Sequence, residues 1–171
     1  SLIQEPVIVH EKSASDLIRL GESATLEFKS TFQWDVVSNH ENKGLRKQVL
    51  KTLAAFLNSS GGTLVIGIED DGNVLGLDRD LSLVQNSTDK FLVQLSNTVV
   101  ENIGAEFSPM IKMRFETVSD RLVCVLDVTQ SPMPAYLKTE KGLEFFIRFG
   151  PTSRALDLSE AIAYVNMHWN S

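Results

Sequence analysis

Hydrophobic residues recur at helical spacing in four segments of the chain. In the clearest of them the apolar positions fall on one face of a helix. They are Leu45, Val49, Leu53, Phe56 and Leu57. Glycines or short polar runs follow several of these segments, as expected where helices end. The pattern predicts helices over residues 13–20, 43–58, 88–103 and 157–169.

Strand-like patterns are interspersed with these helices. Residues 25–32 alternate apolar and polar, with Leu26, Phe28 and Phe32 on one face, which is typical of a half-buried strand. Residues 63–68 are apolar on both faces, as in a central strand. Further strands are predicted over residues 74–77, 110–118, 121–128, 135–138 and 143–149. Hairpins mixed with helices indicate an α+β fold, with a mixed, largely antiparallel sheet packed by three to four helices.

Length and charge limit the possible classes of protein. The chain has 171 residues, which suits one domain, and its 43% hydrophobic content excludes wholesale disorder. The formal net charge of −6 argues against a protein coated in positive charge but permits a local basic face. We expect an extended arm over residues 1–12 and a single domain over residues 13–171, cut from a longer protein. No apolar run approaches the ~20 residues that span a membrane.

The usual signatures of catalytic and metal sites are mostly missing from the sequence. No phosphate-binding G-x-x-x-x-G-K-[ST] loop is present, so the sequence does not support ATP binding. The histidines lie far apart and there is one cysteine, which argues against a zinc site. Cys124 lies in an apolar strand and is expected to be an inert core residue, and a lone cysteine suits a reducing cytoplasm.

A series of short motifs nevertheless stands out. In chain order they are Glu22, Glu27-Phe28-Lys29, Ala55-Phe56-Leu57-Asn58, Gly61-Gly62, Gly67-Ile68-Glu69-Asp70 and Arg148-Phe149-Gly150. Together they resemble the Schlafen-type AlbA-like domain over residues 13–155. The resemblance implies an α+β fold that occurs in bacterial nucleic-acid-associated and regulatory proteins and in vertebrate Schlafens.

The resemblance also implies an acidic site. In ribonuclease members of the family three acidic residues hold a divalent metal, and the matching residues here are Glu22, Glu27 and Asp70, with Glu69 or Asp71 as alternatives for the third. Carboxylate oxygens suit Mg²⁺ or Mn²⁺, which can activate water beside a scissile phosphate. Five residues along one straight strand would put Glu22 and Glu27 on opposite faces, so such a site requires a bend between them.

Basic residues predict where phosphates would be contacted. The candidates are Lys29, Lys47, Lys51, Arg148 and Arg154. Lys47 and Lys51 are one helical turn apart, opposite the apolar stripe, with Lys43 and Arg46 nearby. Each of these side chains could equally be part of a solvated face or of a structural ion pair.

The leading hypothesis is a DNA- or RNA-binding module of a transcriptional regulator or defence protein. The alternatives are a metal-dependent endoribonuclease that uses Glu22, Glu27 and Asp70, and an oligomerisation module without a ligand. In Schlafens two such lobes form the RNA groove, so we expect a homodimer to complete it. Tyr164, Met167 and Trp169, near the chain end, are candidates for that interface, and packing on the domain's own sheet is the alternative for them.

Overall fold

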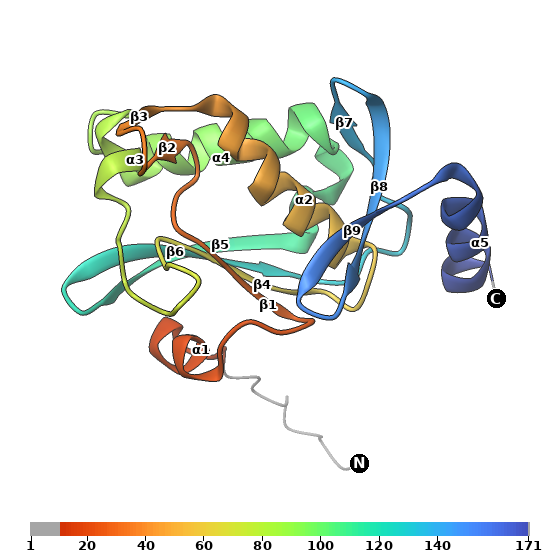
Figure 1. The fold of residues 1–171 in the computed structure, drawn as a ribbon, viewed down its shortest axis with the longest axis horizontal. Coiled ribbons are helices and arrows are strands. Elements are labelled where there is room, and N and C mark those ends of the chain that lie inside the picture. The colour runs from red at the N-terminus through yellow and green to blue at the C-terminus, as the bar shows by residue number, and fades with distance from the viewer. Residues whose placement is uncertain (1–10, 171) are drawn as a thin grey trace, which may run out of the picture.

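The computed structural model describes residues 11–170 and contains a four-stranded sheet with helices on both faces (Figure 1). The strands, in spatial order, are β1 (Leu26–Lys29), β4 (Gly62–Ile66), β6 (Arg121–Val128) and β5 (Ile111–Val118). β1 and β4 run parallel, while β4 pairs with β6 and β6 with β5 in antiparallel fashion. This mixed, mostly antiparallel sheet confirms the predicted α+β class.

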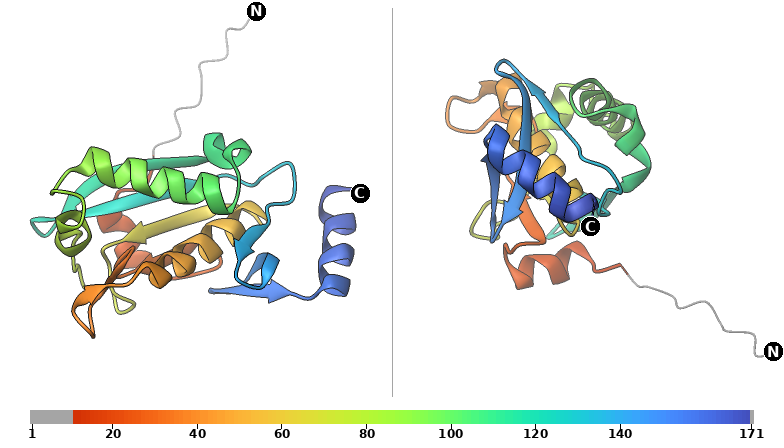
Figure 2. Two further views of the ribbon diagram at one scale, coloured as in Figure 1. Left: turned by 90° about the horizontal axis from the view of Figure 1, so that it is seen from above. Right: turned by 90° about the vertical axis from the view of Figure 1, so that its right-hand side faces the viewer.

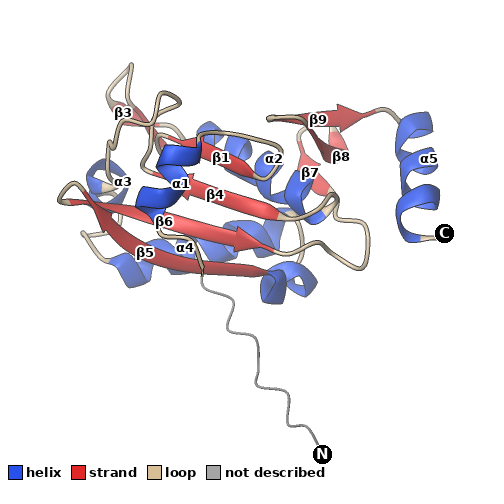
Figure 3. Cartoon of the chain, turned by 90° about the horizontal axis from the view of Figure 1, so that it is seen from below, coloured by secondary structure: helices blue, strands red, loops and turns tan. Residues whose placement is uncertain are grey.

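Helices α2 and α4 cover one face of the sheet, and α1 covers the other (Figures 1 and 3). The α-helices are α1 (Ala14–Leu20), α2 (Arg46–Leu57), α3 (Asp78–Ser82), α4 (Thr88–Asn102) and α5 (Leu158–Trp169). Two 3-10 helices accompany them, η1 (Lys43–Leu45) and η2 (Ala105–Met110). All four predicted helices are present, whereas the short α3 was not predicted. None of the helices in the described part of the chain is long and apolar enough to cross a membrane.

Each face of the main sheet has its own hydrophobic core. Leu64 and Ile66 of β4 face the core under α2 and α4, and Val65 faces the core under α1, which confirms the prediction of a central strand. The strand predicted over residues 25–32 is shorter, because β1 ends at Lys29. Phe32 therefore enters the α2–α4 core instead of sharing a face with Leu26 and Phe28.

A second, three-stranded antiparallel sheet lies at one end of the molecule, beside α2 and α5 (Figure 2). Its strands are β7 (Leu137–Thr139), β8 (Gly142–Phe149) and β9 (Thr152–Leu156). β9 corrects the sequence analysis, which placed no strand after β8. The helix α5 that follows begins with the capping box of Asp157 and Glu160.

Two further comparisons with the sequence concern the segments outside the main helices and strands. A two-stranded ribbon, β2 (Trp34–Asp35) and β3 (His40–Glu41), lies between β1 and η1, where no strand is predicted from the sequence. The predicted arm over residues 1–12 lies outside the described residues except for its last two.

Candidate functional site

Glu27 is buried on the sheet face that α2 and β8 cover. It pairs in register with Leu64 of β4, whose side chain belongs to the α2–α4 core. Its carboxylate contacts Arg148 Nη2 at 2.7 Å and Lys29 Nζ at 3.2 Å. The Glu27 side chain is 10% exposed and that of Arg148 is 2% exposed. The Glu-Phe-Lys motif and the late arginine therefore meet in one buried ionic cluster.

Arg148 connects β8 to the turn before β1. Its nitrogens also donate to the carbonyl oxygens of Ser23, Ala24 and Leu26 and to Ser153 Oγ. The guanidinium carbon lies 5.0 Å from the centre of the Phe56 ring in α2. Every guanidinium nitrogen thus has a partner within the fold. A direct phosphate contact, as the sequence suggested for Arg148, would require the guanidinium to leave these partners.

Glu22 and Asp70 lie near the Glu27 cluster. Ser23 and Leu26 form an isolated antiparallel bridge, which supplies the bend expected between Glu22 and Glu27. Glu22 Oε1 accepts the Phe28 N–H at 3.0 Å. Partial burial raises the pKa of Glu22, the Phe28 N–H lowers it, and the nearby Glu27 and Asp70 carboxylates raise it further. The fold thus brings the predicted acidic residues into one electrostatic neighbourhood.

The arrangement of these carboxylates does not fit a three-carboxylate metal site. Their oxygens are the donors that Mg²⁺ or Mn²⁺ prefers. However, residues 11–170 contain no group of three or more Asp, Glu, His or Cys residues placed to share a metal ion. Both oxygens of Glu27 already contact cations, Arg148 and Lys29. Metal binding and catalysis by Glu22, Glu27 and Asp70 stay predictions, and they would require Glu27 to leave these two cations.

The remaining predicted phosphate contacts lie on α2 and β9. On α2, Lys47 Nζ is 2.8 Å from Glu140 Oε1, and Lys51 lies 5.6 Å from the centre of the Phe146 ring. The bond to Glu140 raises the pKa of Lys47, against a smaller effect of burial. On β9, Arg154 lies 3.5 Å from Glu160 of α5. The fold thus separates Arg154 from the two lysines of α2, while Lys29 and Arg148 meet at Glu27.

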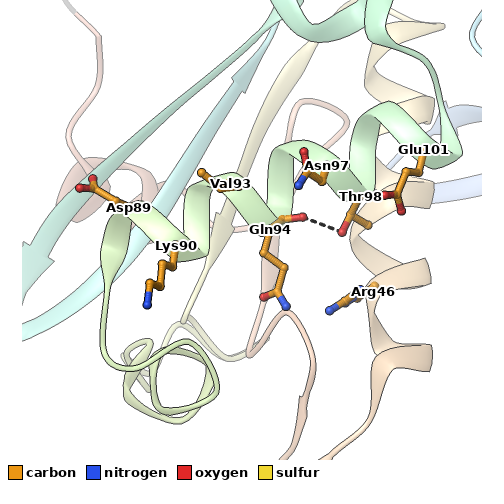
Figure 4. Close-up of a pocket in the computed structure, with 8 residues that line it drawn as sticks. All are labelled: Arg46, Asp89, Lys90, Val93, Gln94, Asn97, Thr98 and Glu101. Atoms are coloured by element: carbon orange, nitrogen blue, oxygen red, sulfur yellow. Dashed lines mark hydrogen bonds between the residues drawn. The ribbon is translucent and has the colours of Figure 1, made fainter.

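Two adjoining hollows run along the side of α2 that faces α4 and β7. The first, shown in Figure 4, lies between α2 and α4 and is charge-balanced, with Arg46 and Lys90 opposed by Asp89 and Glu101. The second, which we name the α2–β7 pocket, is lined by η1, α2, α4 and β7. It is basic, with four cations and one carboxylate, Glu140. The cations are Lys43, Arg46, Lys47 and Lys138.

Three of these cations, Lys43, Arg46 and Lys47, are close along one helix and are visible as a group in the sequence, although the sequence does not show a pocket there. That group does not include Lys138, which comes from β7 and reaches the pocket only through tertiary packing. No local pattern around Lys138 could have shown that.

Comparison with known proteins now identifies the family. The sequence matches the model of the family described as Schlafen, AlbA_2 over residues 22–157. The chain belongs to the Schlafen AlbA_2 family. This confirms the resemblance drawn from the motifs. A search of curated proteins gave no match.

Two solved structures resemble this Schlafen AlbA_2 domain. One is the DIP2311 protein from Corynebacterium diphtheriae, with a TM-score of 0.59 and 18% identity, matched over 85% of this chain and 27% of that protein. The other is the N-terminal domain of a protein from Nitrosomonas europaea that is described as related to the ATP-dependent DNA helicase RecG. Its TM-score is 0.53 with 23% identity, over 86% of this chain and 95% of that domain. At these identities the similarity shows the fold alone.

Other family motifs in this Schlafen AlbA_2 chain serve the fold. Asn58, buried after α2, donates through Nδ2 to the carbonyl oxygens of Ala135 and Phe146 and accepts the Ala135 N–H. A Cβ on Gly62 would lie 2.6 Å from the Phe56 ring. Asn58 therefore holds the segment that precedes β7 against β8. The absence of a side chain at Gly62 lets β4 pass beside α2.

Proposed function

We propose that this domain binds nucleic acid, DNA or RNA, as a module of a transcriptional regulator or defence protein. The observation that carries the proposal is the basic α2–β7 pocket. Its lining includes Lys47, one of the predicted phosphate contacts. It concentrates four cations at one place on a chain whose formal net charge is −6. Family membership supports the proposal, as does the name of the Nitrosomonas europaea protein, which describes it as related to the DNA helicase RecG.

The charge distribution suits a polyanion better than a neutral partner. Nucleic acids are bound chiefly through phosphates, and local cations release the condensed counterions whatever the total charge of the protein. Lys47 and Lys51 lie one turn apart on α2, so they can follow a phosphate backbone along the helix. Lys29 and Arg154 are paired with Glu27 and Glu160, so their phosphate contacts would require partner exchange.

The test is binding of single-stranded RNA and duplex DNA at several salt concentrations, measured by fluorescence anisotropy. We expect binding at low salt and a salt slope that falls by about one for each phosphate contact removed. The double variant Lys47→Glu with Lys51→Glu should weaken binding strongly. Lys112→Glu, a single charge reversal on the edge strand β5, is the control and should have little effect. Absence of binding to both nucleic acids at low salt would refute the proposal.

We further propose that the domain forms a homodimer through α5. Three apolar residues of this helix are exposed, Leu158 at 78%, Ile162 at 55% and Met167 at 80%. Tyr164 instead packs on Phe145 of its own domain, which is the alternative that the sequence left open for it. Light scattering over a concentration series should give twice the mass of one chain.

Ile162→Glu should abolish the dimer, because it places a charge in the proposed interface. Val93→Glu, at a 59% exposed position of α4, is the control and should leave the dimer intact. A monomeric mass for the unaltered domain at the highest concentration would refute this second proposal.

A further inference from the structure

The α2–β7 pocket is a recess formed by three separate parts of the chain. Its walls come from η1 together with the first turns of α2, from the C-terminal half of α4, and from the β7–β8 hairpin (compare Figures 1 and 2). Its volume is ≈ 420 Å³. The apolar side chains of Leu50 and Leu137, both buried, support the cations that line it. The recess is therefore fixed by the hydrophobic core and does not depend on one flexible loop.

The cations of the pocket are unevenly neutralised. Lys43 and Lys138 have no carboxylate within 4.0 Å among residues 11–170. Lys47 is paired with Glu140, and Glu144 Oε2 also lies 4.0 Å from Lys47 Nζ. The pocket therefore keeps a positive excess even when both carboxylates are counted.

Arg46 is held in place by neutral neighbours. Its Nε donates to Gln33 Oε1 at 2.8 Å, Nη2 donates to the same oxygen, and the guanidinium lies 5.4 Å from the centre of the Phe32 ring. Gln33 and Phe32 are fully buried, and Gln33 Nε2 in turn donates to Gln94. These contacts orient the arginine without neutralising it. Its Nη1 has no hydrogen-bond partner within the described part of the chain.

Glu140 is placed to compete with a bound anion. It lies in the two-residue turn between β7 and β8, and its side chain is 71% exposed. Its only cation within 4.0 Å among the described residues is Lys47. An exposed ion pair of this kind is weak, because water screens it and both side chains lose freedom. A phosphate, which accepts several charge-assisted hydrogen bonds at once, can therefore displace the carboxylate from Lys47.

We propose that the α2–β7 pocket binds a phosphate group of the nucleic acid through Lys43, Arg46, Lys47 and Lys138, and that Glu140 blocks Lys47 until the phosphate arrives. This inference rests on the proposed function and specifies where a phosphate is held. Binding transfers Lys47 from the Glu140 carboxylate to the phosphate oxygens, and no covalent bond changes.

The experiment uses inorganic phosphate as the probe, followed by amide chemical shifts in NMR spectra of the domain. Phosphate should shift the amides of η1 and β7 in a saturable way. Lys43→Gln with Lys138→Gln should weaken phosphate binding by at least ~10-fold, the loss of about one charge-assisted hydrogen bond. Glu140→Gln should strengthen it, because Lys47 is then no longer paired. Lys112→Gln, which removes a single charge on β5 away from the pocket, should leave the phosphate affinity unchanged.

The same variants are then tested against RNA and DNA, with thermal melting to show that each is folded. Failure of phosphate to shift the η1 and β7 amides, with nucleic-acid binding unchanged in the Lys43 and Lys138 variant, would overturn this inference and leave the proposed function standing. Phosphate binding in the pocket with no binding of either nucleic acid would refute the proposed function and leave the pocket as a phosphate site for another ligand. A Glu140→Gln variant with unaltered phosphate affinity would overturn the blocking role of Glu140.

Discussion

Arg148 of β8 contacts Glu27 of β1 at 2.7 Å, although the two residues are 121 positions apart in the chain. The contact joins the small sheet to the edge strand of the main sheet, next to Phe56 of α2. Because the side chains are 2% and 10% exposed, neither charge can be solvated if the other is lost. Two motifs that the sequence shows separately are therefore parts of one structural interaction.

The first prediction concerns the stability supplied by this contact. Arg148→Met leaves the Glu27 carboxylate buried beside Lys29 alone and should lower the free energy of unfolding by about 3–5 kcal/mol. Arg154→Met removes an exposed pair with Glu160 and should cost less than about 1 kcal/mol. Urea unfolding followed by tryptophan fluorescence measures both values.

A double-mutant cycle separates the pair from the other contacts of Arg148. The double variant Glu27→Gln with Arg148→Met should lose less stability than the sum of its single variants, because it leaves no unpaired carboxylate. Additive losses would show that Arg148 acts through its backbone and Phe56 contacts alone.

The second prediction concerns divalent metal. Glu27 is occupied by Arg148 and Lys29, so we expect Mn²⁺ to leave the melting temperature of the domain unchanged. A ligand that binds only the folded state would raise that temperature. The opposite result, a Mn²⁺-dependent rise that disappears in Glu22→Gln, would show that the acidic residues rearrange into a metal site. Cleavage of structured RNA only when Mn²⁺ is present would then support the ribonuclease alternative.

Sequence patterns identified the helices and the family but not the environment of the site residues. The stripe from Leu45 to Leu57 predicts α2 because helical periodicity is local. The alternation around Glu27 predicts a strand equally well, but it does not show that α2 and β8 cover the face carrying Glu27. Burial of that carboxylate depends on packing between distant segments.

Polar residues without a motif show the same limit. Asp80 lies in the short α3 and Lys138 in a three-residue strand, where no periodicity can develop. Asp80 is nevertheless buried, at 1% exposure, and Lys138 lines the α2–β7 pocket. Asp80 accepts hydrogen bonds from the backbone N–H groups of residues 32 and 33, which are more than 40 positions away in sequence. Only the folded chain shows such contacts.

The third prediction concerns Cys124. The thiol lies in the α2–α4 core at 0% exposure, and burial raises its pKa to about 12. A thiol reacts as the thiolate, so the folded domain should resist alkylation at neutral pH. Mass spectrometry after iodoacetamide treatment should show no adduct in buffer and one adduct in denaturing urea. Rapid labelling in buffer would show that β6 opens to solvent without global unfolding.

The fourth prediction concerns the pH dependence of stability that arises from Asp80. Its carboxylate accepts the Phe32 N–H at 2.7 Å and the Gln33 N–H at 3.0 Å. Burial raises the pKa of Asp80 above its ordinary 3.8, and these N–H groups lower it by less. The folded state thus holds the proton more tightly than the unfolded state does. The stability contributed by Asp80 is present below pH 3.8 and is lost as the pH rises through the raised pKa.

Asp80→Asn is the variant that isolates this effect, because asparagine does not titrate. It should be less stable than the unaltered chain, by about 1–3 kcal/mol, since its single carbonyl oxygen cannot accept both N–H groups on separate atoms. The difference should shrink as the pH is raised from below 3.8 toward neutrality, when urea unfolding of the two proteins is compared at each pH. A difference that grows with pH would mean that the backbone N–H groups outweigh burial and that the carboxylate is stabilised in its charged form.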